Sequence, residues 1–158
     1  MDIYLQAKTK FTITGSGSGA TDISTVLGTP YLCVNGTPID WAPVGQKTLF
    51  IPKKLKKNGK YLSLNNYFDI LSNDDKGSYL MSQFYNNEAM SIEDNSAEEI
   101  LDATNEMFLR LEEVYKESDE DRARQEKYQE IHSKSPQFGE SKTPICREFL
   151  KSNQWFIE

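Results

Sequence analysis

The sequence predicts an α/β fold in which a strand–helix–strand unit precedes a helix-rich region. The chain has 158 residues, of which 37% are hydrophobic and 11% aromatic, enough for one domain with a packed core. Two apolar runs flank a short helical pattern near the N-terminus, and helical periodicity dominates from residue 63 onward. We therefore expect a single domain over residues 1–158, with the strand–helix–strand unit in 1–52 and a mostly helical part in 63–158.

Local signals place the elements of the first unit. Residues 2–8 suit a short helix or an edge strand, and β-branched and aromatic residues predict a strand at 11–14. The next apolar residues recur at three- and four-residue spacing, which predicts a short helix that ends at Gly28. The continuous apolar run at 31–34 is typical of a strand buried on both faces. The order strand, helix, strand predicts that the two strands are parallel.

The next third of the chain is less regular. Residues 48–52, "TLFIP", predict a short strand or an extended arm, and five lysines then fall within eight residues in "KKLKKNGK". Such a run usually forms a solvated turn. Ser63 precedes a predicted helix at 64–72, and a second, aromatic helix is predicted at 78–87 after a polar turn.

Three further elements are predicted toward the C-terminus. The strongest is a helix at 96–117, where Ser96 and Glu99 form a capping box ahead of an apolar stripe that runs to Val114. The charged stretch 118–134 predicts an exposed helix, with acidic residues leading and basic residues following, as the helix dipole favours. The segment 145–156 ends the chain with apolar residues that we expect to dock on the body.

Composition excludes several classes of function. A net charge of −6 and an isoelectric point near 4.9 argue against nucleic acid as a partner, because phosphate-backbone binding needs a broad basic face. No apolar stretch is long enough to span a bilayer, so any membrane association is expected to be peripheral. Cys33 and Cys146 have no metal-type spacing, which predicts a reduced, cytoplasmic protein without a metal site. His132 lies in a charged helix, where we expect a surface residue without a catalytic role.

The most distinctive motif is "TGSGSGATD", residues 14–22, between the first strand and the first long helix. Small residues before a helix expose backbone amides that bind anions with the help of the helix dipole. No Gly-Lys-Ser/Thr follows, which excludes a Walker A phosphate loop. Asp22, in the first helical turn, is placed to accept hydrogen bonds from ribose hydroxyls.

Two other interpretations of this turn stay open. Gly15, Gly17 and Ala20 match the dinucleotide pattern G-x-G-x-x-A, with Asp40 at 20 residues beyond Ala20. A glycine- and serine-rich stretch can also be an exposed flexible linker. Trp41, next to Asp40, offers an aromatic face for a base or a sugar ring, and it serves equally well as an anchor in the core.

Residues 2–35 resemble the nucleotide-sugar segment in the C-terminal half of GT-B-type glycosyltransferases and related epimerases. The likeness is carried by the small-residue turn, the acidic position on the helix and the "LGTP" that precedes the next strand. "LFIPKKL", "IEDNSAEEILDATNEMFLRL" and "CREFLKSN" look like the last part of a group of bacterial glycosyltransferases of surface polysaccharide synthesis. The resemblance covers about Asp2 to Trp155.

The resemblance implies a partial Rossmann-like domain of the GT-B C-terminal type that holds a UDP- or GDP-sugar donor. A glycan acceptor would be contacted by an N-terminal domain, so we expect this chain to be a C-terminal half or a truncated form with a partner domain or chain. It identifies no catalytic residue. The residues that would contact the donor are Ser16, Gly17, Ser18, Gly19, Ala20, Thr21 and Asp22.

Two lysine side chains are further candidates for the donor site. A different class of function competes with nucleotide-sugar binding. Lys53 and Lys54, in the lysine run, are candidates for neutralising the donor's diphosphate. The competing function is a non-catalytic interaction module, in which an acidic outer face and the aromatic C-terminal segment serve assembly. A dinucleotide-binding domain is the third possibility.

Overall fold

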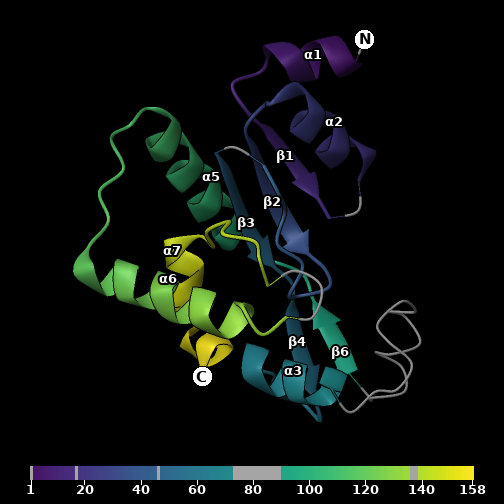
Figure 1. The fold of residues 1–158 in the computed structure, drawn as a ribbon, viewed down its shortest axis with the longest axis vertical. Coiled ribbons are helices and arrows are strands. Elements are labelled where there is room, and N and C mark those ends of the chain that lie inside the picture. The colour runs from purple at the N-terminus through teal and green to yellow at the C-terminus, as the bar shows by residue number, and fades with distance from the viewer. Residues whose placement is uncertain (1, 17, 46, 73–89, 136–138) are drawn as a thin grey trace.

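The fold is α/β, as the computed structural model in Figure 1 shows. It describes residues 2–16, 18–45, 47–72, 90–135 and 139–158. A three-stranded parallel sheet in the order β1-β2-β3 joins a three-stranded antiparallel sheet in the order β5-β4-β6. The arrangement is compatible with a partial Rossmann-like fold.

The strand–helix–strand prediction is confirmed. The first elements are α1 (Asp2–Lys8), β1 (Thr12–Gly15), α2 (Gly19–Leu27) and β2 (Tyr31–Gly36). β1 and β2 are parallel, with Thr12 beside Tyr31 and Gly15 beside Val34. Gly28 ends α2 at φ 67°, a left-handed conformation that glycine adopts without steric cost.

The third parallel strand leads directly into the second sheet. β3 (Thr48–Pro52) pairs with β2, and after one residue the chain continues as β4 (Lys54–Lys57). β4 pairs with β5 (Lys60–Tyr61) and with β6 (Met90–Glu93), so the lysine run forms a hairpin rather than only a turn. Long-range pairing with 90–93 decides this, and β6 was not predicted as a strand.

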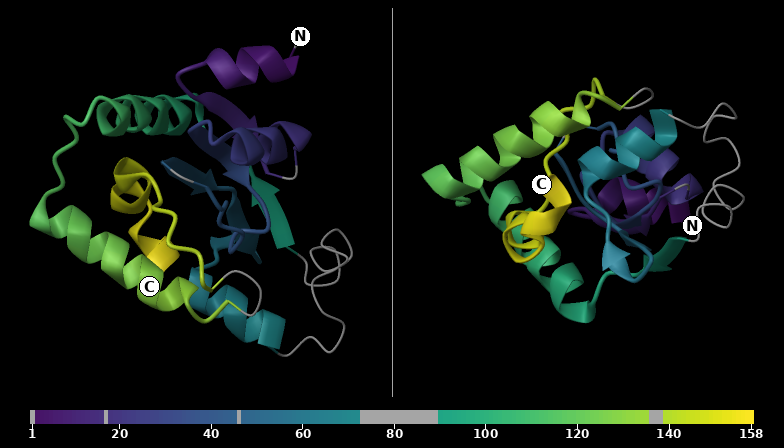
Figure 2. Two further views of the ribbon diagram at one scale, coloured as in Figure 1. Left: turned by 45° about the horizontal axis from the view of Figure 1, so that its top comes forward. Right: turned by 90° about the horizontal axis from the view of Figure 1, so that it is seen from below.

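Helices cover both faces of the parallel sheet. Tyr31 and Phe50 lie on one face, where the hydroxyl of Tyr31 is 3.5 Å from that of Thr25 in α2 and the ring of Phe50 contacts Tyr128. Tyr128 belongs to α6 (Asp119–His132). The other face carries α5 (Ala97–Leu111), and the two views in Figure 2 place α5 and α6 on opposite sides.

The C-terminal segment fills the space between α5 and α6, as predicted from its apolar residues. α7 (Arg147–Ser152) and the 3₁₀ helix η2 (Gln154–Ile157) lie there (Figure 2), with α3 (Leu64–Ser72) packed below. Phe149, Leu150 and Phe156 are buried. Just before α7, Ile145 forms a parallel bridge with Phe50, so this segment covers the outer edge of β3.

Two predictions about the helices need correction, and one lies outside the described residues. α5 has the predicted capping box of Ser96 and Glu99 but ends at Leu111, which leaves Val114 exposed. α6 is not simply an exposed helix, because one of its faces contributes Tyr128 and Ile131 to the core. The aromatic helix predicted at 78–87 lies outside the described residues.

Candidate functional site

The glycine–serine turn lies at the carboxyl end of β1, where open α/β sheets commonly bind their ligands. Ser16 fastens this turn to the chain after β2, since its hydroxyl oxygen accepts a hydrogen bond of 3.0 Å from the backbone amide of Thr37. Gly17 lies outside the described residues. At Ser16 the turn is therefore hydrogen-bonded to the segment that follows β2, unlike a free flexible linker.

Ser18 is the N-cap of α2. Its hydroxyl oxygen accepts a hydrogen bond of 3.2 Å from the amide of Ala20, and its carbonyl accepts one of 2.9 Å from the amide of Thr21. These two amides are thus paired within the turn. Gly19 is exposed, and a Cβ at this position would meet nothing within 4 Å.

Thr21 points into the protein rather than toward solvent. Its side chain is buried, and its hydroxyl donates to the carbonyl of Gly15 at 3.2 Å and lies 3.1 Å from the hydroxyl of Thr14. These bonds hold α2 against β1. Of the predicted donor contacts, Thr21 therefore has the clearest structural role.

Asp22 and Trp41, two candidates from separate parts of the sequence, line the same groove. This groove has a volume of about 350 Å³ and lies between α2 and residues 41–44. Asp22 is exposed and Trp41 is half-buried. The groove also receives the side chains of Thr25 and Tyr31, so it combines a carboxylate, an indole and hydroxyl groups. A sugar or nucleoside needs such a set of contacts.

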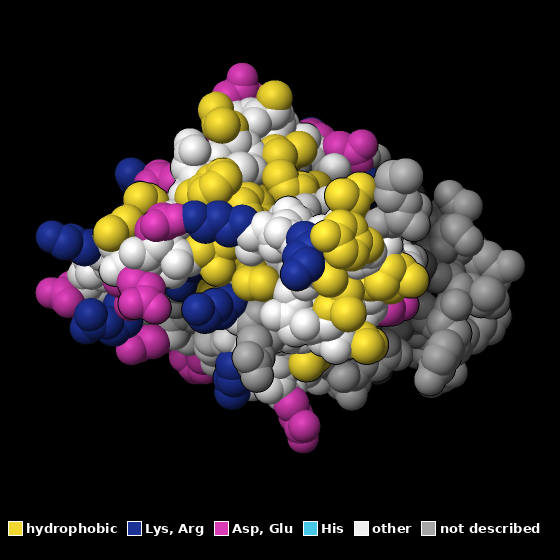
Figure 3. Space-filling view, turned by 90° about the horizontal axis from the view of Figure 1, so that it is seen from above, with side chains coloured by type: hydrophobic (Ala, Val, Ile, Leu, Met, Phe, Trp, Pro, Cys, Tyr) yellow, Lys and Arg dark blue, Asp and Glu magenta, His cyan; other side chains and the backbone are white. Residues whose placement is uncertain are grey.

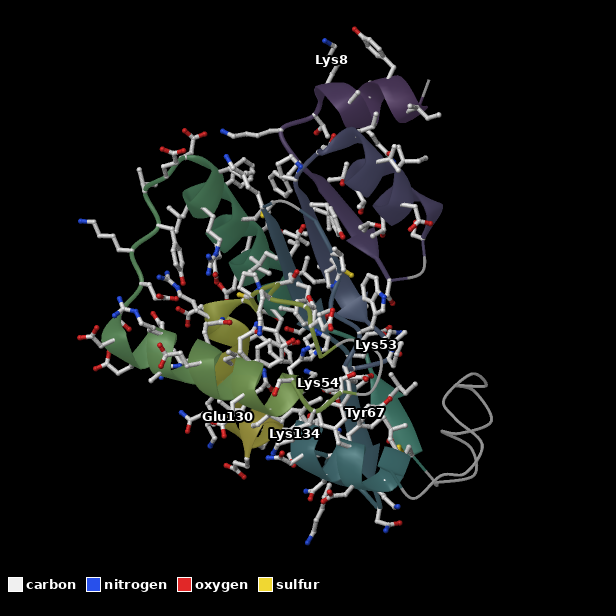
Figure 4. The ribbon with its side chains drawn as sticks, viewed as in Figure 1. Lys8, Lys53, Lys54, Tyr67, Glu130 and Lys134 are labelled. Atoms are coloured by element: carbon white, nitrogen blue, oxygen red, sulfur yellow. The ribbon has the colours of Figure 1, made fainter. Side chains whose placement is uncertain are left out.

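Lys53 and Lys54 lie at the junction of the two sheets and differ sharply in environment (Figure 4). Lys53 is partly exposed and pairs with Asp94 at 2.7 Å. Lys54 is buried, and its ammonium lies 3.0 Å from Glu93 and 3.1 Å from Glu99. The two carboxylates offset the charge of Lys54, so it serves the fold, and Lys53 is the lysine with access to an anion.

Asp40 and His132 form a buried polar cluster that the sequence did not predict. His132 is fully buried, contrary to the expected surface position, and its Nε2 donates to the carbonyl of Asp40 at 2.7 Å. Ser135 donates to the Asp40 carboxylate at 2.8 Å. Burial raises the pKa of Asp40 and lowers the pKa of His132.

This cluster bears on the dinucleotide interpretation. That interpretation assigns the carboxylate of Asp40 to a ribose, but Asp40 is only 3% exposed and its carboxylate accepts a hydrogen bond from Ser135.

The spacing of Tyr128, Ile131 and His132 along α6, at three and four residues, was the sequence signal for a buried face.

Within the described residues, no cluster of three or more histidine, cysteine or carboxylate side chains could hold a metal ion. Over the same residues, no helix has both the length and the apolar character that a bilayer crossing requires. Comparisons of the chain with family models, with curated proteins and with solved structures each found no match.

Proposed function

We propose that this chain is a sugar-nucleotide-binding α/β domain of the GT-B glycosyltransferase type, acting in bacterial glycan synthesis. The observation that carries the proposal is the convergence of Asp22 and Trp41 on one groove beside the first turn of α2. The parallel β1–α2–β2 unit supports it, because it presents a helix N-terminus at the carboxyl edge of the sheet.

Each part of the donor would have a separate contact. The diphosphate would lie at Gly19, where the positive end of the α2 dipole favours negative charge and the missing side chain leaves room. Asp22 would accept hydrogen bonds from ribose hydroxyls, and Trp41 would stack on the base or the sugar. In a transfer reaction, the helix terminus would stabilise charge that develops on the departing nucleoside diphosphate.

Tryptophan fluorescence offers a direct test, because the chain has only two tryptophans. Trp155 stacks on Tyr61, with ring centroids 4.6 Å apart, whereas Trp41 lines the groove. In Trp155→Phe, the emission therefore reports on Trp41 alone. We expect UDP, GDP or their sugar conjugates to quench it in a saturable manner, and NAD to have no effect.

Substitutions in the groove test the assignment of each contact. Asp22→Ala should weaken nucleotide binding about tenfold or more, the usual effect of losing a hydrogen bond to a charged group. Gly19→Val should block the phosphate position without unfolding α2, since a Cβ there has open space. Asp102→Ala, on an exposed part of α5, is the charge-matched control. Absence of any nucleotide response in the parent chain would overturn the proposal.

A second function, assembly with another chain, is favoured by exposed apolar side chains on α1 and α2. Ile3, Tyr4 and Val26 are 59%, 65% and 85% exposed. Hydrophobic side chains are prominent on the face that includes α1, viewed from above in Figure 3. The aromatic C-terminal segment, the earlier candidate for assembly, is mostly buried instead. Light scattering on the parent chain and on Tyr4→Ser with Val26→Ser measures whether these side chains hold chains together.

A further inference from the structure

A second cavity, larger than the Asp22 groove, lies next to that groove. Its volume is about 1090 Å³, which is at the upper end of the usual range for small-molecule sites. It is bounded by the start of β3, the end of α5, residues 133 and 135, and residues 139–144. Ala42 and Val44 line both the cavity and the groove, so the two spaces are neighbours.

Three hydroxyl groups in the cavity wall donate their protons to backbone carbonyls of the protein. Ser133 donates to the carbonyl of Glu130 at 2.6 Å. Ser141 and Thr143 both donate to the carbonyl of Pro43. A hydroxyl that donates inward has only lone pairs left to offer a ligand. This part of the wall therefore favours a ligand that donates hydrogen bonds.

The charged side chains in the wall are nearly balanced. Lys47 and Lys142 are exposed donors, and Glu113 and Glu140 are acceptors of opposite charge. The guanidinium of Arg110 is held by Glu106, which is 2% exposed and lies 2.7 Å away. A multiply charged anion would gain little from this balance and would face the lone pairs of the hydroxyls.

Apolar side chains supply the rest of the surface. Met107, Leu111 and Pro144 line the same cavity as the hydroxyls. A carbohydrate matches both the hydroxyl-lined and the apolar surfaces of the cavity, because its hydroxyls donate and accept hydrogen bonds while its C–H faces are apolar. Phosphate and carboxylate groups at neutral pH only accept hydrogen bonds and match neither part.

We propose that this cavity binds a neutral oligosaccharide, which would be the acceptor next to the donor groove. The role as an acceptor rests on the proposed function, whereas carbohydrate binding is inferred from the cavity alone. The family resemblance implied that another domain contacts the acceptor, whereas the present proposal places the acceptor in a cavity of this chain. Its position beside Val44 brings acceptor and donor to adjoining sites.

The test uses amide NMR shifts of the complete chain, whose mass of 18.1 kDa suits the method. The probes are maltotriose, triacetylchitotriose and the acidic trigalacturonate. At least one neutral trisaccharide should shift amides at Ser133 and at 141–143 in a saturable manner, with weaker shifts from trigalacturonate. No shift from either neutral probe, or a preference for the acidic one, would overturn the inference.

Two variants locate the binding. Ser133→Ala combined with Lys142→Ala removes one acceptor and one donor and should weaken binding about tenfold. Ser133→Trp should abolish it by filling space, and the helical backbone at this C-cap tolerates any side chain. Lys127→Ala with Ser152→Ala, at exposed positions outside the cavity lining, is the matched control. Binding that Ser133→Trp leaves unchanged would contradict the assignment to this cavity.

The outcome is separable from that of the proposed function. Asp22→Ala should leave oligosaccharide binding at the cavity unchanged, because this residue lines only the groove. Nucleotide binding without oligosaccharide binding would reject the cavity and keep the donor site. Oligosaccharide binding without nucleotide binding would keep the cavity and reject the transferase.

Discussion

The two ends of the parallel sheet differ in whether their polar side chains are paired inside the protein or line an open cavity. At the carboxyl end, side chains of the turn and of the lysine run are mostly paired within the protein, as Ser16, Thr21 and Lys54 show. At the amino end of β3, hydroxyls line an open cavity and keep lone pairs for a ligand. Polar residue type alone therefore does not mark a site, since burial and hydrogen-bond partners together decide which groups a ligand can reach.

The largest expected effect on stability is at the carboxyl end, in Asn95→Ala. The Asn95 side chain accepts a hydrogen bond of 2.6 Å from the amide of Asn35 and donates one of 2.8 Å to the carbonyl of Pro52. Its loss removes one part-buried and one buried hydrogen bond to the backbone, which should lower the free energy of unfolding by about 3 kcal/mol. Urea denaturation measures this. A loss below about 1 kcal/mol would show that water replaces Asn95 and that this end is less closed than described.

The two neighbouring lysines form the next test. Lys54→Ala should cost about 2 kcal/mol, because Glu99 loses its buried partner while Glu93 remains partly solvated. Lys53→Ala should cost less than about 0.5 kcal/mol, since its partner Asp94 is 70% exposed. Denaturation curves of the two variants, recorded side by side, check the difference. Equal costs would contradict the structural role given to Lys54.

A smaller effect is expected where α2 meets β1. Thr21→Val removes the hydroxyl that bonds to Gly15 and should cost about 1 kcal/mol. Thr104→Val, in α5, is the matched control, because its hydroxyl bonds to the carbonyl of Ile100 one turn earlier in its own helix, and it should cost a few tenths of that. Thermal unfolding of both variants provides the measurement. If nucleotide affinity fell in Thr21→Val without a loss of stability, Thr21 would belong to the donor site after all.

The last test concerns the protonation of Glu93, which is partly exposed to solvent. Hydrogen bonds from Lys56, then from Lys54 and Tyr61, lower the pKa of Glu93 to about 2 from 4.5. A lowered carboxyl pKa contributes stability that is present above pH 4.5 and is lost as the pH falls toward 2. Carboxylate NMR titration should find this midpoint, and Lys56→Ala should return it toward 4.5. A normal midpoint in the parent chain would show that solvent screens these contacts.

Elements with strong local signals were predictable. α2 ends at Gly28 and α5 begins at its capping box, both as predicted, because these contacts involve residues within a few positions. The pairing of β4 with β6 was not predictable from local signals, since it joins segments more than thirty residues apart. The burial of His132 was missed for a similar reason, because its partner Asp40 belongs to a distant loop.

Local sequence patterns were sufficient to predict the parallel strand–helix–strand unit, the capping box of α5, the apolar C-terminal segment and the candidates Asp22 and Trp41. Hydrophobic periodicity and cap chemistry are local properties of a chain. The three-dimensional fold was needed to show that Asp22 and Trp41 line one groove and that Thr21 and Lys54 serve the fold. It was also needed to show that the hydroxyls of Ser133, Ser141 and Thr143 line a cavity. These facts depend on which distant groups meet and on which way each hydroxyl donates its proton.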